Sequence, residues 1–177
     1  MAKILLSTPR LNLREITRED APFLMKLMNT PDWLTNIGDR GINSLEAAIV
    51  FVETRCLPAY EKNLASYLIE IKDGSIPIGT CGIHTRDYLD IPDVGYSLLP
   101  EYYKQGYAYE ASEAIIRYAK TNWGLSRISG MVIPSNTPSI RLLEKLGLKY
   151  VSPIEVPNDP EVVHLYVGDA EPTPTRS

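Results

Sequence analysis

The sequence has few cysteines and histidines, and this scarcity limits the metal chemistry open to the chain. Its 177 residues include two cysteines, Cys56 and Cys81, and two histidines. The cysteines are far apart and form no CxxC pair, whereas zinc sites and disulfide frameworks need closely spaced ligands. We therefore expect no metal site and no disulfide framework. Cys81 lies in a strand pattern, and we expect it to pack in the core.

The sequence also lacks an excess of positive charge and any long apolar run. Lys and Arg total 18 against 22 Asp and Glu, which gives a formal net charge of −4 at pH 7. Binding of nucleic acid phosphates needs a broad basic surface, so we expect no nucleic acid partner. The run "AAIVFV" is too short to cross a bilayer, and polar residues interrupt the amino end "MAKILLSTPR". We expect a cytoplasmic protein without a membrane partner.

The chain does have enough apolar residues to bury a core. Hydrophobic residues make up 44% of the sequence, which suits a single globular domain, and we place this domain at residues 1–168. The last stretch, "DAEPTPTRS" (169–177), lacks the apolar residues needed for order. We expect this tail to be disordered.

Hydrophobic periodicity predicts a mixed α+β fold. Strands are expected within 10–15, 65–85 (a hairpin with a "KDGS" turn), 92–100, 126–133 and 161–168. Helices are expected within 17–29, 44–55 (capped by Ser44), 107–123 and 136–147, the last capped by Asn136 or Thr137 and ended by Gly147. A longer loop is expected at 86–92. Antiparallel hairpins thus lead into a β-α-β-α-β half that should be locally parallel.

The stretch "YYKQGYA" places a lone glycine, Gly106, between a strand and a helix. Unpaired N–H groups and the positive dipole at a helix amino terminus favour an anion, so a phosphate could bind here. Gly106 would let the backbone come close to it, and Lys104 could add positive charge. The alternative is that Gly106 only makes a turn.

Three separate motifs carry a family resemblance. "IGTCGI", "DVGYSLLPEYYKQGYAYEA" and "NTPSIRLLEKLGL" together resemble the GNAT superfamily of acyl-CoA-dependent N-acetyltransferases, over residues 8–167. The opening "TPRLNLREITREDAPFL" and the ending "SIRLLEKLGL" resemble the branch of ribosomal-protein N-terminal acetyltransferases of the RimJ/RimL type. The resemblance implies a mostly antiparallel central sheet flanked by helices, with a splayed parallel strand pair. It also implies transfer of acetyl from acetyl-CoA to a primary amine, with a protein or peptide N-terminus as the favoured acceptor, by direct attack in a ternary complex.

The resemblance also assigns residues to the acetyl-CoA co-substrate. The backbone of Ser97, Leu98 and Leu99 would bind the pantetheine arm. The pyrophosphate would lie on the backbone of Tyr103, Lys104, Gln105, Gly106, Tyr107 and Ala108. Asn136 would face the cofactor, although helix capping is an alternative role for it. The chain departs from the family loop at Tyr103, where Arg or Gln is usual, and at Lys104, where many members have glycine.

Candidate catalytic residues are Asp93, His84 and Ser139. Asp93 and His84 are possible bases for the amine, and Ser139 could hydrogen-bond the CoA sulfur. Many family members provide an acidic tyrosine one position after the Leu142 equivalent, but this chain has Leu143. Ordinary roles stay open for all three candidates: a strand-end turn residue for Asp93, a strand histidine for His84 and a first-turn serine for Ser139.

The acceptor cleft is expected beside "PDWLTNIGDRGINS" and "RDYLDIP", where Trp33 and Tyr88 could line it. Alternative functions are acetyl transfer to a small-molecule amine and a catalytically silent acyl-CoA sensor or interaction module. A homodimer is a further possible assembly. A nucleotide phosphate-binding protein is not expected, because neither GxxxxGK[ST] nor GxGxxG occurs around Gly106.

Overall fold

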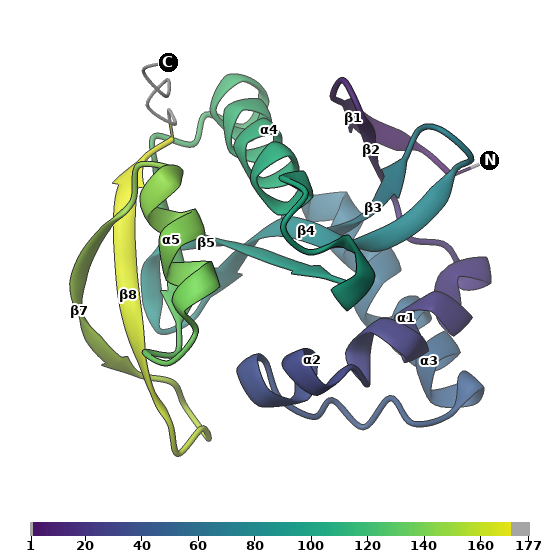
Figure 1. Ribbon diagram of the computed structural model, residues 1–177, viewed down its shortest axis with the longest axis horizontal. Helices are drawn as coiled ribbons and strands as arrows, with labels where there is room; N and C mark the ends of the chain where they lie inside the picture. Colours follow the sequence, from purple (N-terminus) through teal and green to yellow (C-terminus); the bar gives the residue numbers. More distant parts are fainter. Residues whose placement is uncertain (1, 171–177) are drawn as a thin grey trace.

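One mixed sheet with helices on both faces forms the body of the protein, in a computed structural model that describes residues 2–170 (Figure 1). Within that range the sheet has eight strands in the order β1-β2-β3-β4-β5-β6-β8-β7. The strands are β1 (Ile4–Ser7), β2 (Leu11–Arg14), β3 (Ser66–Ile71), β4 (Ile76–Arg86), β5 (Leu89–Leu98), β6 (Arg127–Val132), β7 (Lys149–Glu155) and β8 (Val162–Asp169). The helices are α1 (Ala21–Met28), α2 (Pro31–Asn36), α3 (Leu45–Phe51), α4 (Tyr107–Trp123) and α5 (Thr137–Lys145), and short 3-10 or π turns cover 18–20, 52–62 and 100–102. The predicted α+β class is confirmed.

Among the described strands, β5 and β6 are the parallel pair, and the other neighbouring pairs are antiparallel. This confirms the predicted mixed, mostly antiparallel sheet. The prediction that the whole second half is locally parallel is wrong, because β8 runs antiparallel to both β6 and β7. The cause is β7, which was not predicted and which adds one more reversal of chain direction before β8.

Apolar side chains are buried on both faces of the sheet, because successive residues of a strand point to opposite faces. In β3, Tyr67 belongs to the cluster under α4, whereas Leu68 belongs to a second cluster with α1 and α3. Figure 1 shows α4 on one face of the sheet and α1 with α3 on the other. The sheet is thus the middle layer of the domain.

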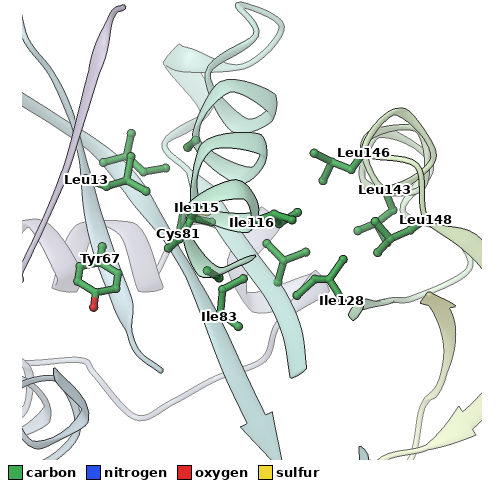
Figure 2. Close-up of a cluster of buried hydrophobic side chains, with 14 of the residues drawn as sticks. Leu13, Tyr67, Cys81, Ile83, Ile115, Ile116, Ile128, Leu143, Leu146 and Leu148 are labelled. Carbon is green, nitrogen blue, oxygen red and sulfur yellow. The ribbon is translucent and has the colours of Figure 1, made fainter. Parts of the chain in front are cut away.

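The larger cluster joins α4 and α5 to the sheet. Figure 2 shows Ile115 and Ile116 of α4 close to Cys81 and Ile83 of β4, with Leu143 of α5 at its edge. Cys81 is 1% exposed, so its predicted place in the core is confirmed. Burying an isoleucine of this size stabilises a fold by about 1.5–3 kcal/mol, so this cluster is a main source of stability.

The ends of the helices follow their predicted stop and start residues. Ser44 caps α3 by accepting a hydrogen bond from the Ala47 N–H at 3.1 Å. Gly124 (φ 70°) follows the last residue of α4, and Gly147 (φ 88°) follows α5 closely. Left-handed backbone of this kind ends helices and suits glycine.

The segment 86–92 is a hairpin rather than the predicted longer loop. β4 ends at Arg86, a tight turn covers Asp87 and Tyr88, and β5 begins at Leu89. Arg86 lies opposite Leu89 in the ladder. The prediction was wrong because turn-forming residue types continue into β5, where one of them lies in a bulge.

This bulge lies beside Pro92. His84 of β4 pairs with Asp93, and between this pair and the hairpin turn β5 has more residues than β4. Pro92 has no N–H to donate, so a bulge tolerates it where a regular ladder would not. The Ser129 hydroxyl of β6 donates to the carbonyls of Ile91 and Pro92 at 3.0 and 3.1 Å. The bulge thereby sets the position of Asp93 beside β6.

β1, α2 and β7 were not predicted, and the carboxyl end of the body extends further than predicted. Asp169 ends β8, and Ala170 is buried at 1% exposure. The predicted disorder of 171–177 lies outside the described residues. Within the part of the chain that the structure covers, no helix is long and apolar enough to span a bilayer. Nor does that part contain three or more His, Cys, Asp or Glu side chains grouped to hold a metal ion.

Candidate functional site

β5 and β6 separate directly after a single ladder pair. Asp93 of β5 lies opposite Ser129 of β6, and the two strands form no other pair within the described range. Beyond Asp93 the edge of β5 is no longer covered by β6. This opening in the sheet is the splayed parallel pair that the family resemblance implied.

Alternate backbone groups of β5 point into this opening. Along an antiparallel ladder, hydrogen-bonded residue pairs alternate with pairs that are not hydrogen-bonded. The Leu99 N–H donates to the Ile78 carbonyl of β4 at 2.8 Å, so Leu99 belongs to a hydrogen-bonded pair. The backbone of Leu99 and Ser97 therefore points toward β4, and that of Leu98 and Tyr96 points into the opening. Leu98 thus has a free backbone for a ligand, and Tyr96, which was not predicted, joins it.

The loop before α4 forms a concave set of backbone N–H groups. Lys104 (φ 60°) and Gly106 (φ 81°) are left-handed, and Gln105 between them is not. Such alternation of hand makes a nest of N–H groups that binds anions. The Glu110 N–H is the first in α4 to donate within the helix, to Gly106 at 3.0 Å, so the N–H groups of residues 107–109 have no helical acceptor. The predicted pyrophosphate loop has the geometry of an anion site.

The two departures from the family loop are both accommodated locally. Lys104 adopts left-handed backbone without being glycine. The Tyr103 N–H donates to the Pro100 carbonyl at 3.1 Å, so the N–H groups without an acceptor begin at Lys104. Burial and the neighbouring Asp32 carboxylate of α2 raise the pKa of Tyr103 to about 12. Its side chain therefore connects the loop to α2.

A side-chain network from the amino-terminal hairpin supports the loop. Arg10 donates from Nη1 to the Gln105 carbonyl at 2.9 Å and from Nε to Glu110 at 2.7 Å. Its guanidinium also lies 4.3 Å from the centre of the Tyr107 ring, and the Thr8 hydroxyl donates to Glu110 at 2.6 Å. Burial opposes the charge of Glu110, but these hydrogen bonds outweigh it and lower its pKa. Arg10 was not predicted to contribute to the site.

The first turn of α5 borders the opening opposite β5. Asn136 is the N-cap, and its side-chain oxygen accepts from the Ser139 N–H at 3.4 Å. Capping uses only this oxygen, which leaves the Asn136 NH₂ group for a ligand. The Tyr96 hydroxyl donates to the Ser139 Oγ at 3.2 Å and to the Ser139 carbonyl at 3.3 Å. A hydroxyl of β5 and one of α5 therefore meet at the opening.

Leu143 occupies the position where many related enzymes have an acidic tyrosine. It is 2% exposed, and it packs so closely on Gly130 that a Cβ there would lie 2.5 Å from Leu143 Cδ2. Leu143 is therefore a core residue. This position offers no proton donor for a leaving thiolate.

Asp93 is buried in an ion pair with Arg86. Arg86 Nε donates to Asp93 Oδ1 at 2.9 Å and Nη2 to Oδ2 at 3.4 Å, and the Asp93 side chain is 4% exposed. Both oxygens of the Asp93 carboxylate are therefore occupied by the Arg86 guanidinium. Asp93 lies beside the opening, opposite Ser129, but its contact with Arg86 suits a structural role better than that of a base.

His84 lies next to Asp93 on the same face of the sheet, because the two residues are ladder partners. Its Nε2 is 3.3 Å from the Ser66 Oγ, and a Cβ on Gly95 would lie 3.5 Å from its Cδ2. Burial lowers the pKa of His84, and the nearby Asp93 opposes this effect only in part. A neutral imidazole can accept a proton, so of the two predicted bases His84 is better suited than Asp93 to act as a general base.

A shallow cavity of about 450 Å³ lies at the β4–β5 turn. Its lining residues are Thr85, Arg86, Asp87, Tyr88 and Pro157. Tyr88 lines this cavity, and Arg86 connects the cavity to Asp93. Trp33 is not part of the lining, and its indole N–H donates to the Gly38 carbonyl at 3.1 Å.

The split strand pair and the N–H nest before α4 are the arrangement that the resemblance implied for an acyl-CoA-dependent acyltransferase. The family model "Acetyltransferase (GNAT) domain" matches residues 10–149. An uncharacterized N-acetyltransferase of Bacillus subtilis, YoaA, is 32% identical over 146 residues, which are 82% of this chain and 82% of YoaA. The chain belongs to the GNAT family of acetyltransferases. The predicted enzyme class, an N-acetyltransferase, is thereby confirmed.

Solved structures show the same fold. RimL, a ribosomal L7/L12 alpha-N-protein acetyltransferase, has a TM-score of 0.81 at 16% identity, over 96% of this chain and 95% of RimL. A GNAT acetyltransferase of Bacillus anthracis has a TM-score of 0.77 at 23% identity, over 96% of this chain and 99% of its own. The predicted RimL-type fold is confirmed.

Proposed function

We propose that the protein transfers the acetyl group of acetyl-CoA to a primary amine, preferably a protein or peptide N-terminus. The observation that carries this proposal is the continuity between the opening at Leu98 and the N–H nest at Lys104 and Gly106. The pantetheine arm would lie along the free edge of β5, and the anionic pyrophosphate would bind in the nest at the positive end of α4.

The reaction is direct attack in a ternary complex. The neutral amine nitrogen bonds to the acetyl carbon, the C–S bond breaks, and the sulfur leaves with its electron pair as a thiolate. His84 accepts the proton that the amine loses, and the Ser139 hydroxyl donates a hydrogen bond to the sulfur. No covalent enzyme intermediate forms, and the buried Cys81 has no part in the chemistry.

The two sets of groups lie on opposite faces of β5, which supports this division of roles. Asp93 and Tyr96 are an odd number of positions apart, so their side chains point to opposite faces. His84 shares the face of Asp93, and Ser139 contacts Tyr96. The amine would approach from the His84 face, and the sulfur would leave toward the Ser139 face.

The weak basicity of His84 supports an α-amino acceptor. An α-amino group has a pKa of about 7.7–8.0, whereas that of a lysine-like amine is about 10.4. Burial lowers the pKa of His84 below its ordinary value, so it is too weak a base for a strongly basic amine. A fraction of α-amino groups is already neutral at pH 7. RimL, which has the same fold, is named for acting on such an N-terminus.

The test is release of CoA thiol in the presence of a panel of peptides with free N-termini, the same peptides with blocked N-termini, and small amines. The proposal predicts saturable release that depends on a free peptide N-terminus. Preference for small amines would correct the acceptor. Tight acetyl-CoA binding without turnover would favour the silent sensor, for which the buried, nonpolar Leu143 is the supporting feature.

A further inference from the structure

In the contact between Tyr96 and Ser139 the tyrosine is the hydrogen-bond donor, and this leaves the serine hydroxyl able to donate to the leaving sulfur. The Tyr96 hydroxyl lies 3.2 Å from the Ser139 Oγ and 3.3 Å from the Ser139 carbonyl oxygen. Tyr96 has one hydroxyl hydrogen, which is shared between these two acceptors of Ser139. Because the Ser139 Oγ accepts from Tyr96, the hydrogen of the Ser139 hydroxyl can be donated to another group.

The two hydroxyl groups lie at the border of the opening between β5 and α5. The Tyr96 backbone points into the opening, and its side chain reaches the first turn of α5. The backbone of Ser139 is held as well, because its N–H donates to the side-chain oxygen of the Asn136 cap. The hydroxyl of Ser139 is thus held by Tyr96 of β5, and its backbone by the Asn136 cap of its own helix.

We propose that Tyr96 is a positioning residue for acetyl transfer, which orients the Ser139 hydroxyl so that its hydrogen points at the thioester sulfur. This inference rests on the proposed function, and it assigns a role to a residue of β5 that makes no other polar side-chain contact in the described part of the chain. Tyr96 neither gains nor loses a proton in the reaction. The thiolate keeps the electron pair of the broken C–S bond and is stabilised by the Ser139 O–H.

The chemistry of the phenol agrees with a positioning role and not with that of an acid. Burial raises the pKa of Tyr96 to about 12. An alkyl thiol has a pKa of about 8.5, so a full proton transfer from this phenol to the thiolate would be uphill by more than a thousandfold. Tyr96 therefore stays protonated and acts through its hydrogen bond.

The direct test is the pKa of the CoA thiol bound to the enzyme, followed by the ultraviolet absorbance of the thiolate. A hydrogen bond to sulfur stabilises the thiolate, so the bound thiol should be more acidic in the wild type than in Tyr96→Phe, by about half a unit to one unit. In the Ser139→Ala background, adding Tyr96→Phe should cause no further change. A purely structural role for Tyr96 would not produce this coupling.

The kinetic test compares the same variants. Tyr96→Phe keeps the ring and should lower kcat about five- to tenfold, with the Kd for acetyl-CoA changed less than about twofold. In the Ser139→Ala background it should have almost no effect on kcat. The matched control is Tyr150→Phe, a tyrosine of β7 that is 51% exposed, which should behave as the wild type.

Several outcomes would overturn the inference. An unchanged thiol pKa and kcat in Tyr96→Phe would do so, as would equal losses with and without Ser139. Failure of the proposed function gives a different result, since it would appear in the wild type as no CoA binding or no acetyl transfer. The thiol titration needs only bound CoA, so it tests Tyr96 even if the acceptor assignment is wrong.

Discussion

Arg10 Nε lies 2.7 Å from the Glu110 carboxylate, although the two residues are 100 positions apart in the sequence. The same guanidinium donates to the Gln105 carbonyl within the loop before α4. The shape of the nest at Lys104 and Gly106 therefore depends on a residue directly before β2. Because the contact fixes the loop that we propose binds the pyrophosphate, its loss should affect ligand binding more than catalysis.

Replacement Glu110→Gln tests this support. The amide keeps the size of the side chain but loses the charge-assisted bonds to Arg10, which should weaken acetyl-CoA binding about fivefold, or by about 1 kcal/mol. The rate at saturating acetyl-CoA should change little. Titration calorimetry measures the affinity, and Glu113→Gln is the control, because Glu113 of α4 pairs with Arg117 instead. Equal affinities for Glu110→Gln and the wild type would contradict a supporting role.

Replacement His84→Gln tests the assignment of the base. Loss of a general base should lower kcat by about 100-fold or more. Because burial lowers the pKa of His84, the acid limb of the wild-type kcat profile should have its midpoint below 6.5. That limb should be absent from the variant. The control is His164→Gln on β8, and an unaltered pH profile in His84→Gln would exclude His84 as the base.

The lowered pKa of His84 should also make the stability of the fold depend on pH. The folded protein binds the His84 proton more weakly than the unfolded chain does, so the stability present above pH 6.5 should fall as the pH drops below that value. Replacement His84→Gln should remove this loss. Thermal unfolding of both proteins at pH 8 and pH 5.5 checks it. A wild type and variant that lose the same stability on acidification would refute it.

Replacing Arg86 should destabilise the fold more than replacing Asp93, its partner in the ion pair. Arg86→Gln leaves a buried carboxylate without its cation, which should cost about 3 kcal/mol in the free energy of unfolding. Asp93→Asn leaves Arg86, whose side chain is 35% exposed and can reach water, so the cost should be smaller, about 1–2 kcal/mol. Urea denaturation measures both. The reverse order, or equal costs, would contradict the burial of Asp93 as the cause of the asymmetry.

The elements with strong periodicity could be predicted from the sequence, and the short exposed ones could not. α4 has a repeating apolar stripe and glycines at both ends, so its limits were predicted closely. β7 has Tyr150 and Val151 exposed and contains Pro153, so it lacks the alternation of a half-buried strand. β1 has only the four residues Ile4–Ser7. Without β7 in the prediction, the direction of β8 was necessarily wrong.

The glycine loop before α4 could be predicted from local motifs, because its shape comes from consecutive residues. The contacts that support it could not, since Arg10 and Glu110 are brought together only by the order of strands in the sheet. The same holds for Tyr96 and Ser139. Tyr96 lies in the motif "DVGYSLL". Backbone groups of successive strand residues point to alternate sides, and this pattern could have placed Tyr96 at the same edge of the strand as Leu98.

The glycines of "IGTCGI" should be required for strand packing. A Cβ on Gly82 would lie 2.1 Å from the Ala65 carbonyl oxygen, so β3 and β4 would have to move apart. Gly82→Ala should cost about 2–3 kcal/mol and lower Tm by about 5–10 °C. The control is Gly95→Ala, for which the nearest atom would be 3.5 Å away and the change in Tm small. Similar Tm values for both variants would argue against this close approach.

Acetyl-CoA should bind along β5 with its pyrophosphate in the nest before α4, and calorimetry with acetyl-CoA, ATP and NAD measures this binding. The wild type should bind acetyl-CoA and bind ATP and NAD much more weakly. Gly106→Glu places a carboxylate in the anion site and should weaken acetyl-CoA binding about 100-fold, because like charges in contact cost several kcal/mol. Gly124→Glu is the matched control, since Gly124 is also left-handed (φ 70°) and has no atom within 4 Å of an added Cβ. Undiminished acetyl-CoA binding by Gly106→Glu would show that the pyrophosphate does not bind in this nest.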